Sequence, residues 1–151
     1  MKIVHAILLP LALITVVALT AGANEPVAPA AVPRTASTPG ARVYIVAPAD
    51  GATVHNPVHV VFGLAGMGVA PAGVAQSGTG HHHLPVDAAL PALDAPIPKD
   101  DHHLHFGGGQ TETELTLAPG AHTLQLLLGD QLHVPHDPAV YSPVIKITVV
   151  E

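Results

Sequence analysis

Residues 58–64, Val-His-Val-Val-Phe-Gly-Leu, carry the pattern that decides the fold of this chain. Apolar side chains occupy every second position, from Val58 through Val60 and Phe62 to Leu64. Successive side chains of an extended strand point to opposite faces, so this alternation predicts a strand with one face in a hydrophobic core.

Similar segments lie on both sides of this strand and are separated by proline and glycine turns. They cover residues 42–47, 81–86, 110–117, 121–128 and 141–150. The sequence shows no sustained helical periodicity, and strands at this spacing are typical of sandwiches and small barrels. We therefore expect an all-β fold, an immunoglobulin-like antiparallel β-sandwich.

Residues 117–124, Leu-Ala-Pro-Gly-Ala-His-Thr-Leu, resemble the corner that leads into a late strand of immunoglobulin-like sandwiches. A tyrosine often takes the position of His122 there, and its ring reaches back to backbone groups. His122 is therefore predicted to be structural. A small cupin-like β-barrel is the alternative fold, because His81-x-His83 followed by Asp87 partly resembles a cupin metal motif, although the spacing departs from that pattern.

Residues 1–23 have the features of a secretory signal peptide: one lysine, an apolar run at 6–19 and a small-x-small exit ending at Ala23. We expect cleavage after Ala23 and a periplasmic or secreted protein with no remaining membrane span, an uncleaved anchor being the alternative. Residues 24–41 contain four prolines and no apolar period, which predicts a flexible linker. The folded domain is then expected at residues 42–151.

The composition excludes several classes of function. A net charge of −6 argues against nucleic acids and anionic membranes as partners, because both require basic patches. The chain has no cysteine, so it contains neither disulfides nor thiolate ligands. It also lacks the Gly-x-Ser-x-Gly and His-Glu-x-x-His motifs of common hydrolases. We expect a binding protein and not an enzyme.

Histidine is the residue type that points to chemistry, with twelve in the chain. Eight of them fall in three short segments, at residues 81–83, 102–105 and 133–136. Because residues i and i+2 of a strand share a face, each of the first two segments should place two imidazoles side by side. The expected pairs are His81 with His83 and His103 with His105.

Imidazole pairs of this kind suit Cu(II) or Zn(II), with a third or fourth ligand from another strand or loop. The predicted ligands are His81, His83, His103 and His105, with His133 and His136 next. The candidate carboxylate partners are Asp87, Asp101 and Asp137. Glycines 107–109 predict a close backbone approach beside the second segment. Copper is the preferred ion and zinc the second, and the expected role is binding, buffering or delivery.

The competing function is a structural or interaction module of the cell envelope, in which the histidines form a hydrogen-bonded hub and the partner is another envelope protein. Geometry separates the two hypotheses. A metal site requires ring nitrogens from at least three of the predicted ligands to converge to within about 4 Å of one point, and dispersed histidines would exclude it.

Longer motifs support a family resemblance. They are Gly-His-His-His-Leu at 80–84, His-Phe-Gly-Gly-Gly-Gln-Thr-Glu at 105–112, Leu-Leu-Leu-Gly-Asp-x-x-His-Val-Pro-His-Asp-Pro at 126–138, Ala-Pro-x-Asp-Gly-Ala-x-Val at 47–54, and the loop at 62–73. Over residues 43–149 the chain resembles a bacterial family of exported domains of unknown function. The resemblance implies a periplasmic or envelope setting and supplies no activity. Pro85 departs from the family pattern and predicts that its strand lies at an edge or ends there.

Overall fold

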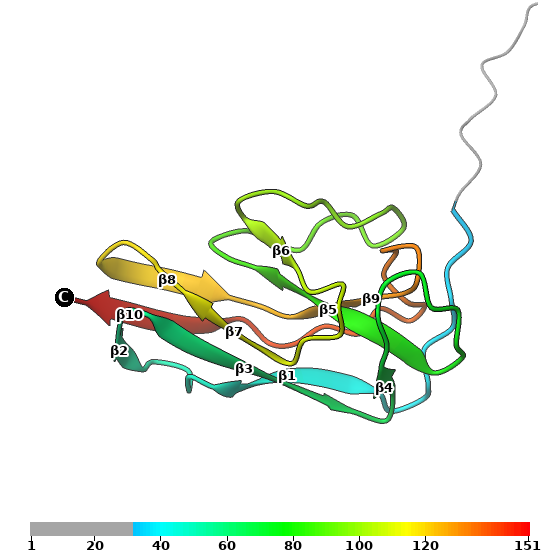
Figure 1. Ribbon diagram of the computed structural model, residues 1–151, viewed down its shortest axis with the longest axis horizontal. Coiled ribbons are helices and arrows are strands. Elements are labelled where there is room, and N and C mark those ends of the chain that lie inside the picture. Colours follow the sequence, from blue (N-terminus) through cyan, green and yellow to red (C-terminus); the bar gives the residue numbers. More distant parts are fainter. Residues whose placement is uncertain (1–31) are drawn as a thin grey trace, which may run out of the picture.

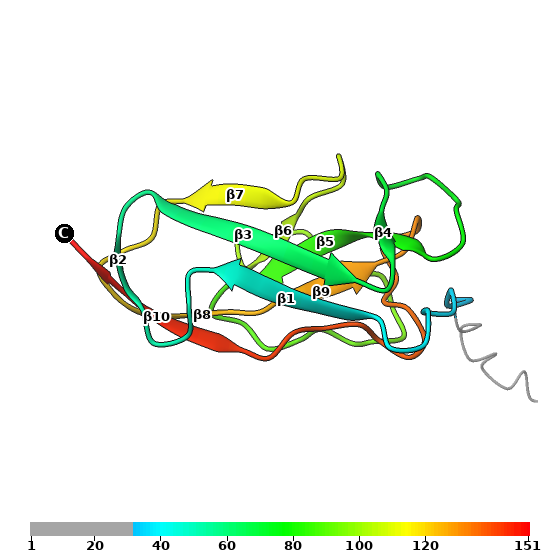
Figure 2. The ribbon, with the colours of Figure 1, turned by 90° about the horizontal axis from the view of Figure 1, so that it is seen from below.

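A computed structural model describes residues 32–151, and the expected signal peptide at residues 1–23 lies outside this range. The described residues form an all-β fold of two facing layers (Figures 1 and 2). The predicted sandwich is confirmed. The sheets of this part of the chain do not close into a barrel, so the cupin-like alternative is wrong. None of these residues belongs to a helix that could cross a membrane.

The first layer has the strand order β1–β3–β7 and is antiparallel throughout. Its strands are β1 (Arg42–Ala47), β3 (Val58–Ala65) and β7 (Glu112–Leu115). In β3 the side chains of Val58, Val60 and Phe62 are buried and His59 is exposed, which confirms the alternation read from the sequence.

The second layer consists of two hydrogen-bonded groups of strands. One has the order β2–β10–β8, with β2 (Thr53–His55), β10 (Ile145–Val150) and β8 (Gly120–Leu124). The other is centred on β5 (Thr79–Pro85), which pairs with β4 (Gly68–Val69), β6 (His103–His105) and β9 (Leu127–Gly129). A bridge between Val86 and Leu124 links the groups. The pairs β2–β10 and β4–β5 are parallel.

Two details of the second layer differ from the sequence-based expectations. The strand expected at 121–128 is split into β8 and β9, because Gln125 and Leu126 turn to Ser142 for hydrogen bonds. The strand that carries Pro85 is central, with β6 and β9 on its two sides. It nevertheless ends at Pro85, whose carbonyl accepts a bond from the Gln125 N–H at 3.1 Å.

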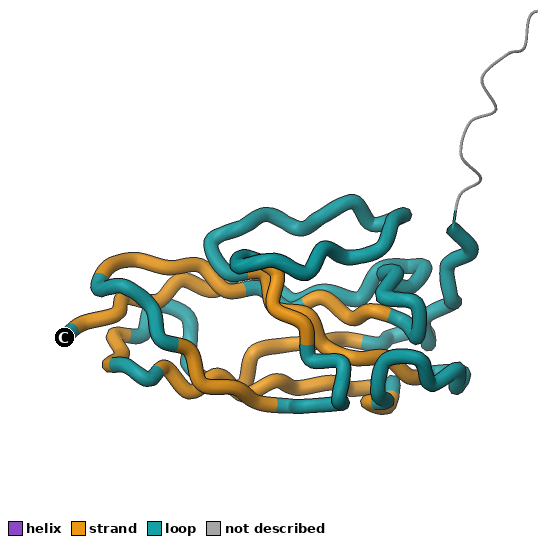
Figure 3. Tube along the Cα trace, turned by 45° about the horizontal axis from the view of Figure 1, so that its top comes forward, coloured by secondary structure: helices purple, strands orange, loops and turns teal. Residues whose placement is uncertain are grey.

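The hydrophobic core lies between the layers and is filled by alternate residues of β3, β5, β8, β9 and β10. Its fully buried members include Val60, Leu84, Leu124, Leu126 and Leu128. In β5 the alternation places His82 and Leu84 on the core side, where the His82 ring lies 5.2 Å from that of Phe62. His81 and His83 therefore occupy the outer face of β5, which loops cover (Figure 3).

The chain before Arg42 contacts the domain. Ala36 forms a parallel bridge with Asp137, and the Ser37 N–H donates to the Asp137 carbonyl at 3.0 Å. Arg34 donates to the carbonyls of Pro135 and His136 and pairs with the Asp137 carboxylate at 3.3 Å. Part of the segment expected to be a linker thus lies along residues 135–137.

The corner at residues 117–124 is built as predicted. One ring nitrogen of His122 donates to the Asp87 carboxylate at 2.7 Å, and the other donates to the Ala118 carbonyl at 2.8 Å. The hydrogen bonds to Asp87 and Ala118 raise the pKa of His122. His122 is structural, and Asp87 is its partner.

We expect Leu124→Ala to destabilise the protein by about 2–5 kcal/mol, because Leu124 is fully buried and its loss leaves a cavity. Leu132→Ala is the matched control, since Leu132 is 56% exposed and should cost less than about 0.5 kcal/mol. Denaturant unfolding followed by circular dichroism measures both. Equal losses in the two variants would contradict this description of the core.

Candidate metal centre

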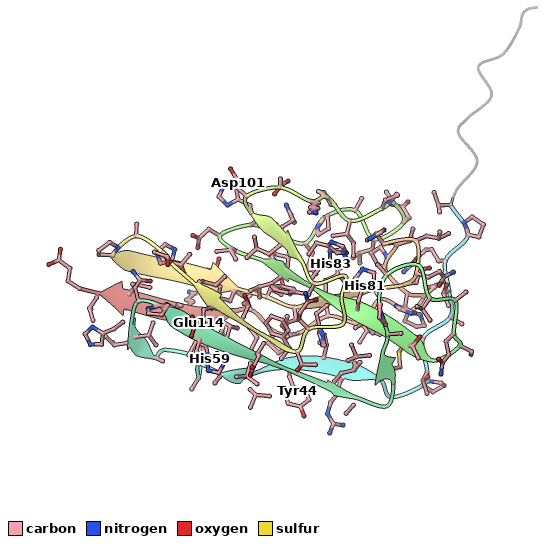
Figure 4. All side chains as sticks on the ribbon, viewed as in Figure 1. Tyr44, His59, His81, His83, Asp101 and Glu114 are labelled. Carbon is pink, nitrogen blue, oxygen red and sulfur yellow. The ribbon has the colours of Figure 1, made fainter. Side chains whose placement is uncertain are left out.

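Four of the six predicted ligands meet on the outer face of β5. His81 and His83 come from β5 itself and are 0% and 1% exposed (Figure 4). His105 lies on β6 directly opposite His83 in the strand register, so its side chain shares the same face. His133 comes from the turn that follows β9, where Gly129 is opposite His81.

The rings of these four histidines are in mutual contact. Ring centroids lie 4.7 Å apart for His105 and His133, 5.0 Å for His81 and His133, and 5.1 Å for His81 and His105. His83 lies 4.8 Å from His81 and 6.1 Å from His133 by the same measure. One ring nitrogen from each of His81, His105 and His133 lies within 4.8 Å of the other two, so these three converge on one point.

A tight turn positions His133. The buried carboxylate of Asp130 accepts hydrogen bonds from the N–H groups of Leu132 and Val134 at 2.8 and 3.0 Å. Thr35 donates its hydroxyl to the same carboxylate at 2.7 Å. His133 itself has a φ of 64°, a left-handed conformation that non-glycine residues rarely adopt. The left-handed backbone of His133 costs about 1 kcal/mol or more, and the hydrogen bonds of the turn offset this cost.

Glycines make room for two of the rings. The ring of His105 lies directly over Gly107, and a methyl group at that residue would collide with it. A methyl group at Gly129 would lie 2.9 Å from Nε2 of His83. The close backbone approach predicted for glycines 107–109 is thus observed at Gly107.

Three of the clustered imidazoles, those of His81, His83 and His105, have lowered pKa values, which favours their neutral form. Burial, followed by the proximity of His133 and His105, lowers the pKa of His81 to about 4. Burial, followed by the proximity of His81 and His105, lowers the pKa of His83 to about 2. The pKa of His105 is also lowered, first by burial and then by His133 and Lys99. Neutral imidazole is the form that binds a metal ion.

Several ring nitrogens of the cluster have no hydrogen-bond partner among the described residues. His81 and His83 share one bond, 3.0 Å between their Nε2 atoms. Nδ1 of His81, Nδ1 of His83 and Nε2 of His105 are buried without a partner in this part of the chain. Each such nitrogen costs about 1–3 kcal/mol, and a cation bound directly to one of them would remove the cost at that nitrogen.

A cleft of about 330 Å³ reaches the cluster from outside. It is lined by His83, Pro96, Ile97, Lys99, His105 and His133. The Ile97 N–H donates to the His133 carbonyl at 2.7 Å, which fixes the loop between β5 and β6 over the cluster. The cleft thus combines imidazoles, an apolar wall and one cation.

The other two predicted ligands lie elsewhere. His103 hydrogen-bonds the Asp100 carboxylate at 2.9 Å, at the far end of β6. His136 is buried beside Gly80, with Nε2 3.1 Å from the Thr79 carbonyl oxygen. The candidate carboxylates Asp87, Asp101 and Asp137 are all exposed, and Asp87 and Asp137 bond His122 and Arg34.

Asp130 and Lys99 also act on the cluster and were not predicted from the sequence. Although burial raises the pKa of Asp130, hydrogen bonds from Thr35, Val134 and Leu132 lower it overall. The negative charge of Asp130 raises the pKa of His81, whereas burial and the neighbouring histidines lower it. The position of Asp130 just after Gly129, at the start of a turn, was an available signal. Nothing in the sequence links Lys99 to the histidines.

The fold and the cluster define a class, a β-sandwich domain with a buried group of imidazoles at the base of a cleft. The chain belongs to the family described as domain of unknown function DUF4399, whose model matches residues 60–150. That range includes all four clustered histidines. No curated protein and no solved structure matches the chain.

We expect the metal-free protein to lose stability as the pH falls below 6.5, the ordinary pKa of histidine. The unfolded chain binds protons there, whereas folded His81 and His83 do so only near pH 4 and 2, so each contributes a slope of about 1.4 kcal/mol per pH unit. His122, with its raised pKa, acts in the opposite direction. Denaturant midpoints at pH 7 and 5 measure the effect.

His83→Leu provides the comparison, because it removes one buried titrating ring and retains an apolar side chain of similar size. The loss of stability between pH 7 and 5 should be smaller in this variant than in the wild type. An equal loss would show that His83 does not stay neutral in the folded state.

Proposed function

We propose that this protein is an exported metal-binding protein that holds Cu(II), or as second choice Zn(II), in the histidine cluster. The convergence of His81, His105 and His133 within 4.8 Å is the observation that carries the proposal. Three imidazoles at this spacing form a common ligand set for both ions, and His83 stands next to them.

The arrangement of hydrogen bonds favours metal binding over a structural hub. A hub would satisfy its ring nitrogens, as His122 does with Asp87 and Ala118. In the cluster, three histidines each keep a buried nitrogen that has no partner among residues 32–151. Buried polar groups in folded proteins are nearly always paired, so this pattern points to an ion as the missing partner.

The chemistry of the donors supports copper as the first choice. Imidazole sites follow the general order of affinity in which Cu(II) exceeds Zn(II). The chain has no cysteine, and Met67 is the only methionine after the expected signal peptide, so a sulfur-rich Cu(I) site is not supported. With the signal peptide expected at residues 1–23, the proposed setting is the periplasm, and the proposed role is buffering or delivery without turnover.

Calorimetric titration of the mature, untagged protein tests the proposal. We expect one Cu(II) ion to bind per chain, and His105→Ala or His133→Ala to weaken binding by about 100-fold or more, because each variant removes one ligand of the three. His59→Ala is the matched control, since His59 is exposed on β3 and pairs with Glu112 at 3.3 Å, away from the cluster.

Binding of both Cu(II) and Zn(II) weaker than about 10 µM, near −7 kcal/mol, would reject the proposal and leave the structural hub. Equal losses in the His59→Ala and His133→Ala variants would show that binding occurs at surface histidines instead.

Gly107→Ala tests the geometry without removing a ligand. The added methyl group would displace the His105 ring, so we expect Cu(II) affinity to fall by about tenfold, as when the support of a metal ligand is lost. Gly68→Ala is the control, because a methyl group there makes only an ordinary contact of 3.5 Å with Thr79. Equal Cu(II) affinity in the two variants would show that His105 does not bind the ion.

A further inference from the structure

Lys99 carries a positive charge in the cleft beside the proposed metal site, where it would repel a bound cation. It lines the cleft beside His83, His105 and His133, and it is close enough to lower the pKa of His105. With a divalent ion on neutral imidazoles, the cleft would hold this cation and the ion together. Asp130, the carboxylate that acts on His81, is fully buried and already accepts three hydrogen bonds.

This excess of positive charge would attract an anion. Three imidazole ligands leave a four-coordinate ion with one further position, as in catalytic and exchangeable zinc sites. His105 and His133 line the cleft while His81 is fully buried, so that position faces the cleft and the Lys99 side of the site.

The apolar part of the cleft indicates which class of anion would fit. Pro96 and Ile97 form the wall beside Lys99, and Ile97 is held in place by its bond to the His133 carbonyl. A volume of about 330 Å³ is at the low end for small-molecule sites and suits a ligand of a few carbon atoms.

We propose that the metal-bound site binds a small aliphatic carboxylate as an additional ligand. A carboxylate oxygen would coordinate the ion, with Lys99 beside the carboxylate group. The alkyl chain would pack against Pro96 and Ile97. This inference rests on the proposed metal binding. It adds a ligand class to the site and explains why a lysine lies next to the histidines.

The experiment uses protein already shown to be loaded with one Cu(II) per chain. Acetate, pentanoate and the neutral amide of pentanoic acid are titrated in turn while the visible and electron paramagnetic resonance spectra of copper are recorded. Both carboxylates should shift the spectra in a saturable way. Pentanoate should bind about fivefold more tightly than acetate, because its chain buries apolar surface against Ile97, and the amide should have no effect.

Variants assign the contacts. Lys99→Met should weaken carboxylate binding by about threefold, since Lys99 is exposed and solvent screens part of the effect of its charge. Ile97→Ala should reduce pentanoate to the affinity of acetate. Lys146→Met is the matched control, because Lys146 is an exposed lysine on β10 whose loss should change nothing.

The outcomes separate this inference from the function on which it rests. Failure of the protein to bind copper would overturn both. A copper-loaded protein whose spectra do not respond to carboxylates would overturn only the anion site and would indicate that His83 completes the coordination. Equal carboxylate binding by the Lys99→Met and Lys146→Met variants would remove Lys99 from the site.

Discussion

Four imidazoles packed side by side over the outer face of β5 are the constraint that shapes this domain. Water would satisfy these rings at little cost, yet His81 and His83 are almost completely buried. Burial without partners is expensive, so the surrounding segments must hold the cluster together. The loop over Ile97, the turn around Asp130 and the glycine under His105 each contribute to that.

Strand β5 contributes side chains to both the hydrophobic core and the histidine cluster. One face of β5 supplies Leu84 to the core between the layers, and the other presents His81 and His83. Pairing with β9 on one side and β6 on the other fixes the strand in both directions. The histidines of β5 and β6 are thereby positioned by strand register and not by loop conformation, which favours a precise arrangement of their imidazole rings.

All four histidines of the cluster were among the residues predicted from the sequence, and the sandwich was predicted because strand alternation is a local property. The i, i+2 rule was sufficient to place His81 and His83 together. It failed for His103, where a neighbouring carboxylate, Asp100, hydrogen-bonds the ring. His136 was predicted only from its histidine-containing segment, and its ring lies beside the Thr79 carbonyl. Asp130 and Lys99 reach the cluster through turn geometry and long-range packing, for which a single sequence carries little signal.

The bond between Thr35 and Asp130 has a mechanical consequence. The chain leaves the domain along residues 135–137, and Thr35 lies within this contact and also holds the carboxylate that shapes the His133 turn. A force that pulls on the N-terminal end of the domain would therefore act on the turn that carries His133 before it acts on the strands of the core. The N-terminal segment and the turn that positions His133 are in this way mechanically connected, with the Thr35 hydroxyl group as one of the links.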